Sequence, residues 1–169
     1  PESQLTVFEL IALGRQPYTN WIDSLSEEDF TKIHWAIEQT EIKHLQHNRF
    51  YELSDGQLQR VLIARALAQD TEIIILDEPT AHLDMHHTFK IFSLLKKLVD
   101  TTGKTIIIST HQVNLAIDLV DELIALSDKG LVSGKVQDLI DNNTLEHLFP
   151  KEIIKFNKTL RQFTIHKNN

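Results

Sequence analysis

Two neighbouring carboxylates, Asp77 and Glu78, carry the clearest chemistry in this sequence of 169 residues. They follow Ile73–Leu76, a continuous branched apolar run that is typical of a strand buried on both faces of a parallel sheet. Acids at such a place are costly unless they face a polar crevice, and open α/β sheets bind ligands at the carboxyl ends of their strands. Asp77 could then hold Mg²⁺, directly or through water, and Glu78 could act as a general base toward a water molecule. An acidic pair that merely caps the next loop is the alternative.

A second candidate is the start of the helix predicted after Leu53. Ser54 can cap this helix, and the unpaired N–H groups of a helix N-terminus form a natural anion site. Gly56 would let a phosphate approach the backbone closely, whereas the carboxylate of Asp55 would repel an anion, so we expect it to point away. The residues expected on the buried face of this helix are Leu58, Val61, Leu62 and Ala66. An ordinary capped helix is the alternative.

Histidines occur at two places that could bear on function. His111 directly follows a predicted strand, where a polar loop residue is the commonest explanation. Asp84 can cap the next predicted helix. Three histidines lie beside it in the sequence: His82, His86 and His87. A metal site is one hypothesis for this cluster, but surface histidines beside a helix cap are the preferred interpretation, because His82 lies in the loop before the helix.

Three short segments together resemble the ATP-binding cassette (ABC) family. Leu53–Gln57, which reads LSDGQ, resembles the family's signature LSGGQ, with Asp55 in place of a glycine. Ile73–Pro79 resembles the Walker B strand, and Ala81–Asp84 resembles the D-loop. These segments stand in the order that the family has, and His111 follows the next predicted strand.

The resemblance implies a composite nucleotide site shared by two subunits. One subunit would supply Asp77 as the Mg²⁺ ligand and two catalytic residues, Glu78 and His111. The other would supply the signature residues Ser54, Asp55, Gly56 and Gln57. The D-loop residues at the dimer interface would be Ala81, His82, Leu83 and Asp84. The implied cofactors are ATP and Mg²⁺, and the implied partners are a second copy of the subunit (a homodimer) and integral membrane permease subunits. The protein would then be cytoplasmic, peripheral on the inner face of the cell membrane.

Within the family, the sequence most resembles importers of iron chelates and vitamin B12. Leu13–Tyr18 and the run Leu53–Gln69 carry this resemblance. The implied mechanism is ATP-driven closure of two subunits, with hydrolysis resetting a transmembrane pair. Two alternatives remain. One is an ABC ATPase that acts on DNA or ribosomes, which a long coiled-coil insertion or a basic face would favour, and neither is present. The other is a non-catalytic interaction module that keeps the fold.

Composition narrows the class of protein. The formal net charge of −7 argues against a nucleic-acid partner, and the absence of cysteine excludes disulfides and thiolate metal sites. Apolar runs fall far short of the ~18 residues of a membrane span, and residues 1–4 lack the features of a signal peptide. The phosphate-binding motif GxxxxGK[ST] is absent, because Gly103–Thr105 matches only its last three positions and lies between a helix and a strand. We therefore expect this chain neither to bind ATP tightly nor to hydrolyse it alone.

The predicted fold class is α/β: part of a P-loop-type, mostly parallel sheet, with an ABC helical subdomain and a small C-terminal α+β tail. Residues 1–52 would form most of the helical subdomain, and residues 53–140 the signature helix and the C-terminal part of the ATPase core. Residues 141–169 would form a tail with a short helix and a hairpin.

Within the helical subdomain, Thr6 and Glu9 form a predicted capping box, and Gly14 is the predicted end of the first helix. We expect a loop at residues 16–21 and a second helix that starts near Ser26. Its predicted buried face carries Phe30, Ile33 and Ile37.

Overall fold

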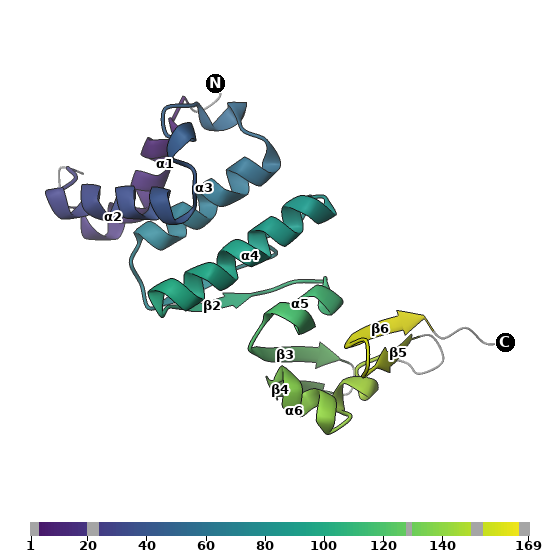
Figure 1. The fold of residues 1–169 in the computed structure, drawn as a ribbon. Coiled ribbons are helices and arrows are strands. Elements are labelled where there is room, and N and C mark those ends of the chain that lie inside the picture. Colours follow the sequence, from purple (N-terminus) through teal and green to yellow (C-terminus); the bar gives the residue numbers. More distant parts are fainter. Residues whose placement is uncertain (1–3, 20–23, 128–129, 150–153, 166–169) are drawn as a thin grey trace. The chain divides into compact units, whose positions relative to one another are not determined.

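The computed structural model describes residues 4–19, 24–127, 130–149 and 154–165. The chain forms two compact units, Pro1–Ser109 and Thr110–Asn169 (Figure 1). The first unit contains α1 (Val7–Ala12), η1 (Leu13–Tyr18), α2 (Glu27–Gln39), η2 (Lys43–Leu45), η3 (Phe50–Glu52), α3 (Asp55–Ala68), β1 (Ile73–Leu76), α4 (Met85–Thr102) and β2 (Thr105–Ile108). The second contains α5 (Val113–Leu119), β3 (Glu122–Ser127), β4 (Gly130–Lys135), α6 (Val136–Asp141), η4 (Thr144–His147), β5 (Ile154–Asn157) and β6 (Gln162–Ile165). The three regions drawn from the sequence divide the chain in another way and remain a prediction.

Three helices, α1, α2 and α3, pack together in the first unit with η1, and we call these four elements the helical part (Figure 1). Each of the three α-helices begins at a residue that closes a capping box with the side chain three positions later. The pairs are Thr6 with Glu9, Ser26 with Asp29 and Ser54 with Gln57. The boxes satisfy backbone N–H groups that a helix start leaves unpaired. The predicted box at Thr6, the helix start near Ser26 and the cap at Ser54 are therefore confirmed.

The core of the helical part consists of apolar side chains withdrawn from water, among them Val7, Ile11, Ile33, Ile37, Val61, Ala64 and Leu67. The predicted buried face of α2 is right at Ile33 and Ile37 but wrong at Phe30, which is 42% exposed and whose ring stacks on Phe8 near the surface. The predicted face of α3 is wrong at Leu62, which is 39% exposed, because α1 and α2 pack on the side of α3 that carries Val61 and Ala64.

The prediction of a loop at residues 16–21 is wrong for residues 16–18, which belong to η1, a 3₁₀-helix that continues directly from α1. Trp21 lies outside the described residues. Gly14 lies in η1 rather than beyond the helix, and a Cβ atom there would stand 2.4 Å from the carbonyl oxygen of Arg65 in α3. Only glycine permits this approach, so Gly14 serves packing between two segments and not the termination of a helix.

The strands β1 and β2 form a parallel pair whose register sets Leu76 opposite Ile108. Ile74 is buried on the face that packs with α4 residues, but Ile75 on the other face is 73% exposed. The expectation that β1 is buried on both faces is therefore wrong for the described residues, since helices cover one face of this pair. The acids after β1 do stand at the carboxyl edge of a parallel pair, as predicted.

The second unit has two antiparallel pairs, β3 with β4 and β5 with β6. Its core contains Ile117, Val136, Leu139, Ile140, Leu145 and Phe156. The predicted C-terminal hairpin is confirmed by β5 and β6. The α/β class with a helical part is confirmed as well, with one parallel and two antiparallel strand pairs among the described residues. No helix within the described ranges is long and apolar enough to cross a membrane.

Candidate functional site

The carboxyl end of β1 presents Asp77 and Glu78 with exposed side chains. The main chain turns sharply there, because Glu78 has a φ of 44°, a left-handed conformation that is uncommon for a residue other than glycine. Its carbonyl oxygen accepts a hydrogen bond from the N–H of Ala81 at 3.0 Å. The Leu83 N–H donates to the carbonyl of Thr80 at 3.3 Å, so Ala81 and Leu83 of the predicted D-loop belong to a hydrogen-bonded turn between β1 and α4.

The hydroxyl of Ser109 joins the two acidic positions. It donates to Oδ1 of Asp77 at 2.5 Å and accepts from the backbone N–H of Glu78 at 2.9 Å. The backbone N–H of Ser109 also donates to the carbonyl of Leu76 at 3.0 Å. Sequence reasoning missed this residue, which lies 31 and 32 positions from its partners. The available signal was that two parallel strands ending at one edge bring their next residues together.

The donor set at this edge suits Mg²⁺. The ion prefers oxygen ligands and is commonly held by one or two carboxylates, with water and substrate phosphates completing its coordination. The exposed carboxylate of Asp77 is such a ligand, and the bond from Ser109 fixes one of its oxygens. Asp77 therefore fits the role of Mg²⁺ ligand that the sequence suggested.

The signature segment is held by two hydrogen bonds between its residues Ser54 and Gln57. Ser54 Oγ accepts from the N–H of Gln57 at 3.4 Å, and Gln57 Oε1 accepts from the N–H of Ser54 at 3.0 Å. Asp55 is the first residue of α3 and is exposed. The direction of its carboxylate stays a prediction, as does the contact of this segment with a nucleotide.

His87, which sequence reasoning left without a role, connects the signature segment to the cap of α4. A Cβ atom at Gly56 would stand 2.8 Å from Cδ2 of His87, so the ring lies directly against this glycine. His87 Nδ1 lies 2.9 Å from Oδ2 of Asp84, and Oδ1 of Asp84 accepts from the N–H of His87 at 2.8 Å. These bonds, first from the backbone and then from the ring, lower the pKa of Asp84. The predicted cap at Asp84 is confirmed.

The histidine cluster has no metal-site geometry within the described part of the chain, where no three His, Asp or Glu side chains gather suitably. The rings of His86 and His87 meet edge to face, with centroids 5.5 Å apart. His82 has a φ of 65° in the turn before α4. His111 lies at the start of the second unit, so its grouping with Glu78 stays a prediction.

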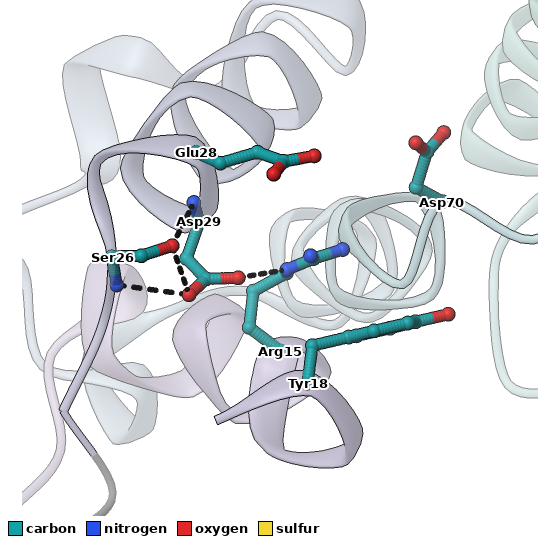
Figure 2. Close-up of a pocket in the computed structure, with 6 residues that line it drawn as sticks. All are labelled: Arg15, Tyr18, Ser26, Glu28, Asp29 and Asp70. Carbon is teal, nitrogen blue, oxygen red and sulfur yellow. Dashed lines mark hydrogen bonds and ion pairs between the residues drawn. The ribbon is translucent and has the colours of Figure 1, made fainter. Parts of the chain in front are cut away.

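A pocket in the first unit, lined by Arg15, Tyr18, Ser26, Glu28, Asp29 and Asp70, was also missed (Figure 2). The Arg15 Nε donates to Oδ1 of Asp29 at 2.7 Å and its Nη1 donates to the carbonyl of Ala68 at 2.9 Å. The guanidinium carbon lies 4.2 Å from the ring centre of Tyr18. Asp29 and the Ala68 carbonyl thus hold the guanidinium in place, and the Asp29 carboxylate compensates its charge.

Asp29 in this pocket has a strongly lowered pKa of about 2. The largest cause is the backbone N–H of Ser26, followed by the Ser26 hydroxyl and then by Arg15. The side chains of Arg15 and Asp29 are only 6% and 5% exposed. The pair therefore links η1 to the start of α2 inside the protein, and we interpret it as a structural ion pair.

Comparison with known proteins supports the interpretation of the motifs. The family model described as "ABC transporter" matches residues 2–81. The chain is 38% identical over 149 residues to the petrobactin import ATP-binding protein FpuD of Bacillus anthracis, covering 88% of this chain and 55% of that protein. It is 40% identical over 149 residues to the iron(3+)-hydroxamate import ATP-binding protein FhuC of Bacillus subtilis (strain 168), covering 87% and 55%. The chain thus spans about half the length of these curated relatives.

Solved structures agree with the fold. An inward-facing structure of an ABC transporter described as metal-chelate type superposes with a TM-score of 0.80 at 26% identity, covering 98% of this chain and 66% of the other. The dimeric structure of MJ0796, a bacterial ABC transporter cassette, superposes with a TM-score of 0.62 at 34% identity, covering 78% and 57%. Two solved ABC transporter structures therefore share most of the fold of this chain.

Proposed function

The chain belongs to the ABC transporter family, and from this premise we propose that the whole protein is the ATP-binding and ATP-hydrolysing subunit of an importer for iron chelates such as siderophores. The observation that carries the proposal is the adjacent pair Asp77 and Glu78 at the carboxyl edge of the parallel strands, on a chain whose relatives are named for petrobactin and iron-hydroxamate import.

Each acid has a separate role in this proposal. Glu78 orients the attacking water and accepts its proton, which an exposed carboxylate at a strand end can do. Asp77 ligates Mg²⁺, directly or through water, and the ion would neutralise charge on the transferred phosphoryl group. The family resemblance of the sequence assigns His111 a contact with the terminal phosphate.

A second copy of the subunit completes the site. The nucleotide held by one copy is bound by the signature segment of the other, which consists of Ser54, Asp55, Gly56 and Gln57. The N–H groups at the start of α3, within this segment, favour an anion. The dimeric structure of MJ0796, a bacterial ABC transporter cassette, supports the pairing of two copies. In this proposal, the residues at the dimer interface are Ala81, His82, Leu83 and Asp84.

The helical part would dock on integral membrane permease subunits, which places the protein on the cytoplasmic face of the membrane. ATP binding closes the two copies, and hydrolysis lets them open again. The 169-residue chain by itself would not hydrolyse ATP, because it contains no GxxxxGK[ST] motif to hold the phosphates.

The test uses the full-length protein co-expressed with its permease subunits. Replacing a general base typically lowers turnover by about 100-fold or more, so Glu78→Gln should abolish most ATPase activity while MgATP still binds. Glu72→Gln is the matched control, because Glu72 is an exposed acid directly before β1 and away from its carboxyl edge. Normal turnover of Glu78→Gln, or of a variant that also carries His111→Ala, would overturn the proposal. Failure to co-purify with a membrane subunit would contradict the proposed role in transport but not the proposed ATPase activity.

A further inference from the structure

We propose that Ser109 is a positioning residue of the hydrolytic site, whose hydroxyl holds the Asp77 carboxylate and the Glu78 main chain in one arrangement; this inference rests on the proposed function. The reacting groups remain the two acids, and Ser109 acts through them.

The position of Ser109 follows from the strand register. Because Leu76 pairs with Ile108, the next residue of each strand also falls at the same level of the edge. The bond from the Ser109 N–H to the Leu76 carbonyl extends the parallel ladder by one step. This backbone bond fixes where the Ser109 side chain begins, independently of its hydroxyl.

The Ser109 hydroxyl makes the two contacts with the acidic residues, one to Asp77 and one to Glu78. A serine hydroxyl has one hydrogen to donate and lone pairs to accept, so it can serve a carboxylate and an N–H group at once. Its hydrogen bond to Oδ1 of Asp77 restrains the position of that oxygen, and it thereby limits the orientations that the carboxylate can take. Ser109 Oγ also accepts a hydrogen bond from the N–H of Glu78, so the main chain of the residue after Asp77 is held by the same oxygen.

The second contact has a further consequence for Glu78. A φ of 44° is unfavourable for a residue with a Cβ atom and persists only where neighbouring contacts impose it. The hydrogen bond from the Glu78 N–H to Ser109 Oγ is such a contact. Without the hydroxyl, the turn after β1 loses a restraint at the residue that must aim a carboxylate at water.

The experiment compares Ser109→Ala with Ser109→Thr in the full-length protein with its permease. Loss of a group that orients a metal ligand commonly costs about 10–100-fold in activity. Ser109→Ala should therefore lower kcat for ATP by about 10-fold or more, with the KM for ATP changed by less than about threefold. Ser109→Thr keeps the hydroxyl and should retain most of the activity. Thr105→Ala, which removes an exposed hydroxyl at the other end of β2, is the matched control.

A second measurement does not depend on turnover. Hydrogen–deuterium exchange of peptides that contain Glu78, in the nucleotide-free protein, should be faster in Ser109→Ala and unchanged in Ser109→Thr, because only alanine removes the acceptor of that amide. Peptides from α2 should exchange alike in all variants.

The outcomes separate this inference from the proposed function. Inactive Glu78→Gln beside fully active Ser109→Ala would overturn the positioning role and leave the proposed function standing. Active Glu78→Gln would overturn the proposed function itself. Equal loss in Ser109→Ala and Ser109→Thr, with unchanged exchange at Glu78, would also contradict the role of the hydroxyl.

Discussion

The helical part and the β1–β2 pair lie in the same unit but are stabilised in different ways. In the helical part, Ile11 and Ile33 are fully buried, and even an ion pair, Arg15 with Asp29, is enclosed. In the strand pair, Ile75 is 73% exposed and the two acids at the strand end are open to water. Their geometry depends on the ladder and on the hydroxyl of Ser109.

This difference indicates that the residues that stabilise the fold and the residues that carry out chemistry lie in different regions of the unit. Close packing and buried charges resist substitution, whereas a carboxylate that must meet water and phosphate has to stay outside the core. Substitutions in the helical part should therefore change the free energy of unfolding, and substitutions at the strand end should change turnover. The following predictions test the stability part of this contrast in the 169-residue chain, from the largest expected effect to the smallest.

The largest effect should come from Arg15→Met, which leaves the Asp29 carboxylate in an enclosed place without its cation. Removing one partner of a buried ion pair typically costs about 3–5 kcal/mol. Two hydrogen bonds from Ser26 to Asp29 persist, so we expect about 3 kcal/mol in urea unfolding followed by circular dichroism. Lys43→Met is the control, because its 3.5 Å pair with Glu38 is on the surface and should be worth less than about 1 kcal/mol. Similar losses in both variants would contradict the contrast.

Gly14→Ala should come next, because the new Cβ atom would meet the Arg65 carbonyl at 2.4 Å and force η1 away from α3. Overpacking of this kind costs about 1–3 kcal/mol. The measurement is again the urea midpoint. An unchanged midpoint would show that η1 does not approach α3 so closely.

The stability contributed by Asp29 should depend on pH. The pKa of Asp29 is lowered to about 2 in the folded chain, so the unfolded chain binds more protons as the solution is acidified. Its contribution is therefore fully present above the ordinary aspartate pKa of about 3.9 and is lost as pH falls toward about 2. Urea midpoints measured from about pH 5 to about pH 2.5 should fall less steeply in Asp29→Asn than in the parent chain. Parallel slopes would contradict this assignment.

The smallest effect should come from Ile75→Thr on the open face of β1. The side chain is 73% exposed, and surface substitutions usually stay within about 0.5 kcal/mol. Ile74→Thr is the matched comparison, because Ile74 is 6% exposed and its replacement puts a hydroxyl against the helices. Equal effects at the two positions would contradict the difference in burial between the two faces of β1.

The candidate site could be predicted in part. Asp77 and Glu78 were found because an apolar run followed by acids is a pattern within a few residues. Ser109 was not found, because its role depends on which strand pairs with β1 and in which register. His87 was interpreted as a surface residue, since only packing of α3 on α4 brings its ring against Gly56.

The sequence by itself determined the helix starts at Thr6, Ser26 and Ser54, the family resemblance and the placement of acids after a strand. All of these depend on residues within a few positions of one another, where backbone geometry is fixed. The tertiary structure alone decided that Arg15 is enclosed with Asp29, 14 positions away, and that Ile75 of β1 is 73% exposed in this chain. Contacts of this kind depend on how whole elements pack, because the energy of a buried charge or an exposed isoleucine is set by its neighbours in space.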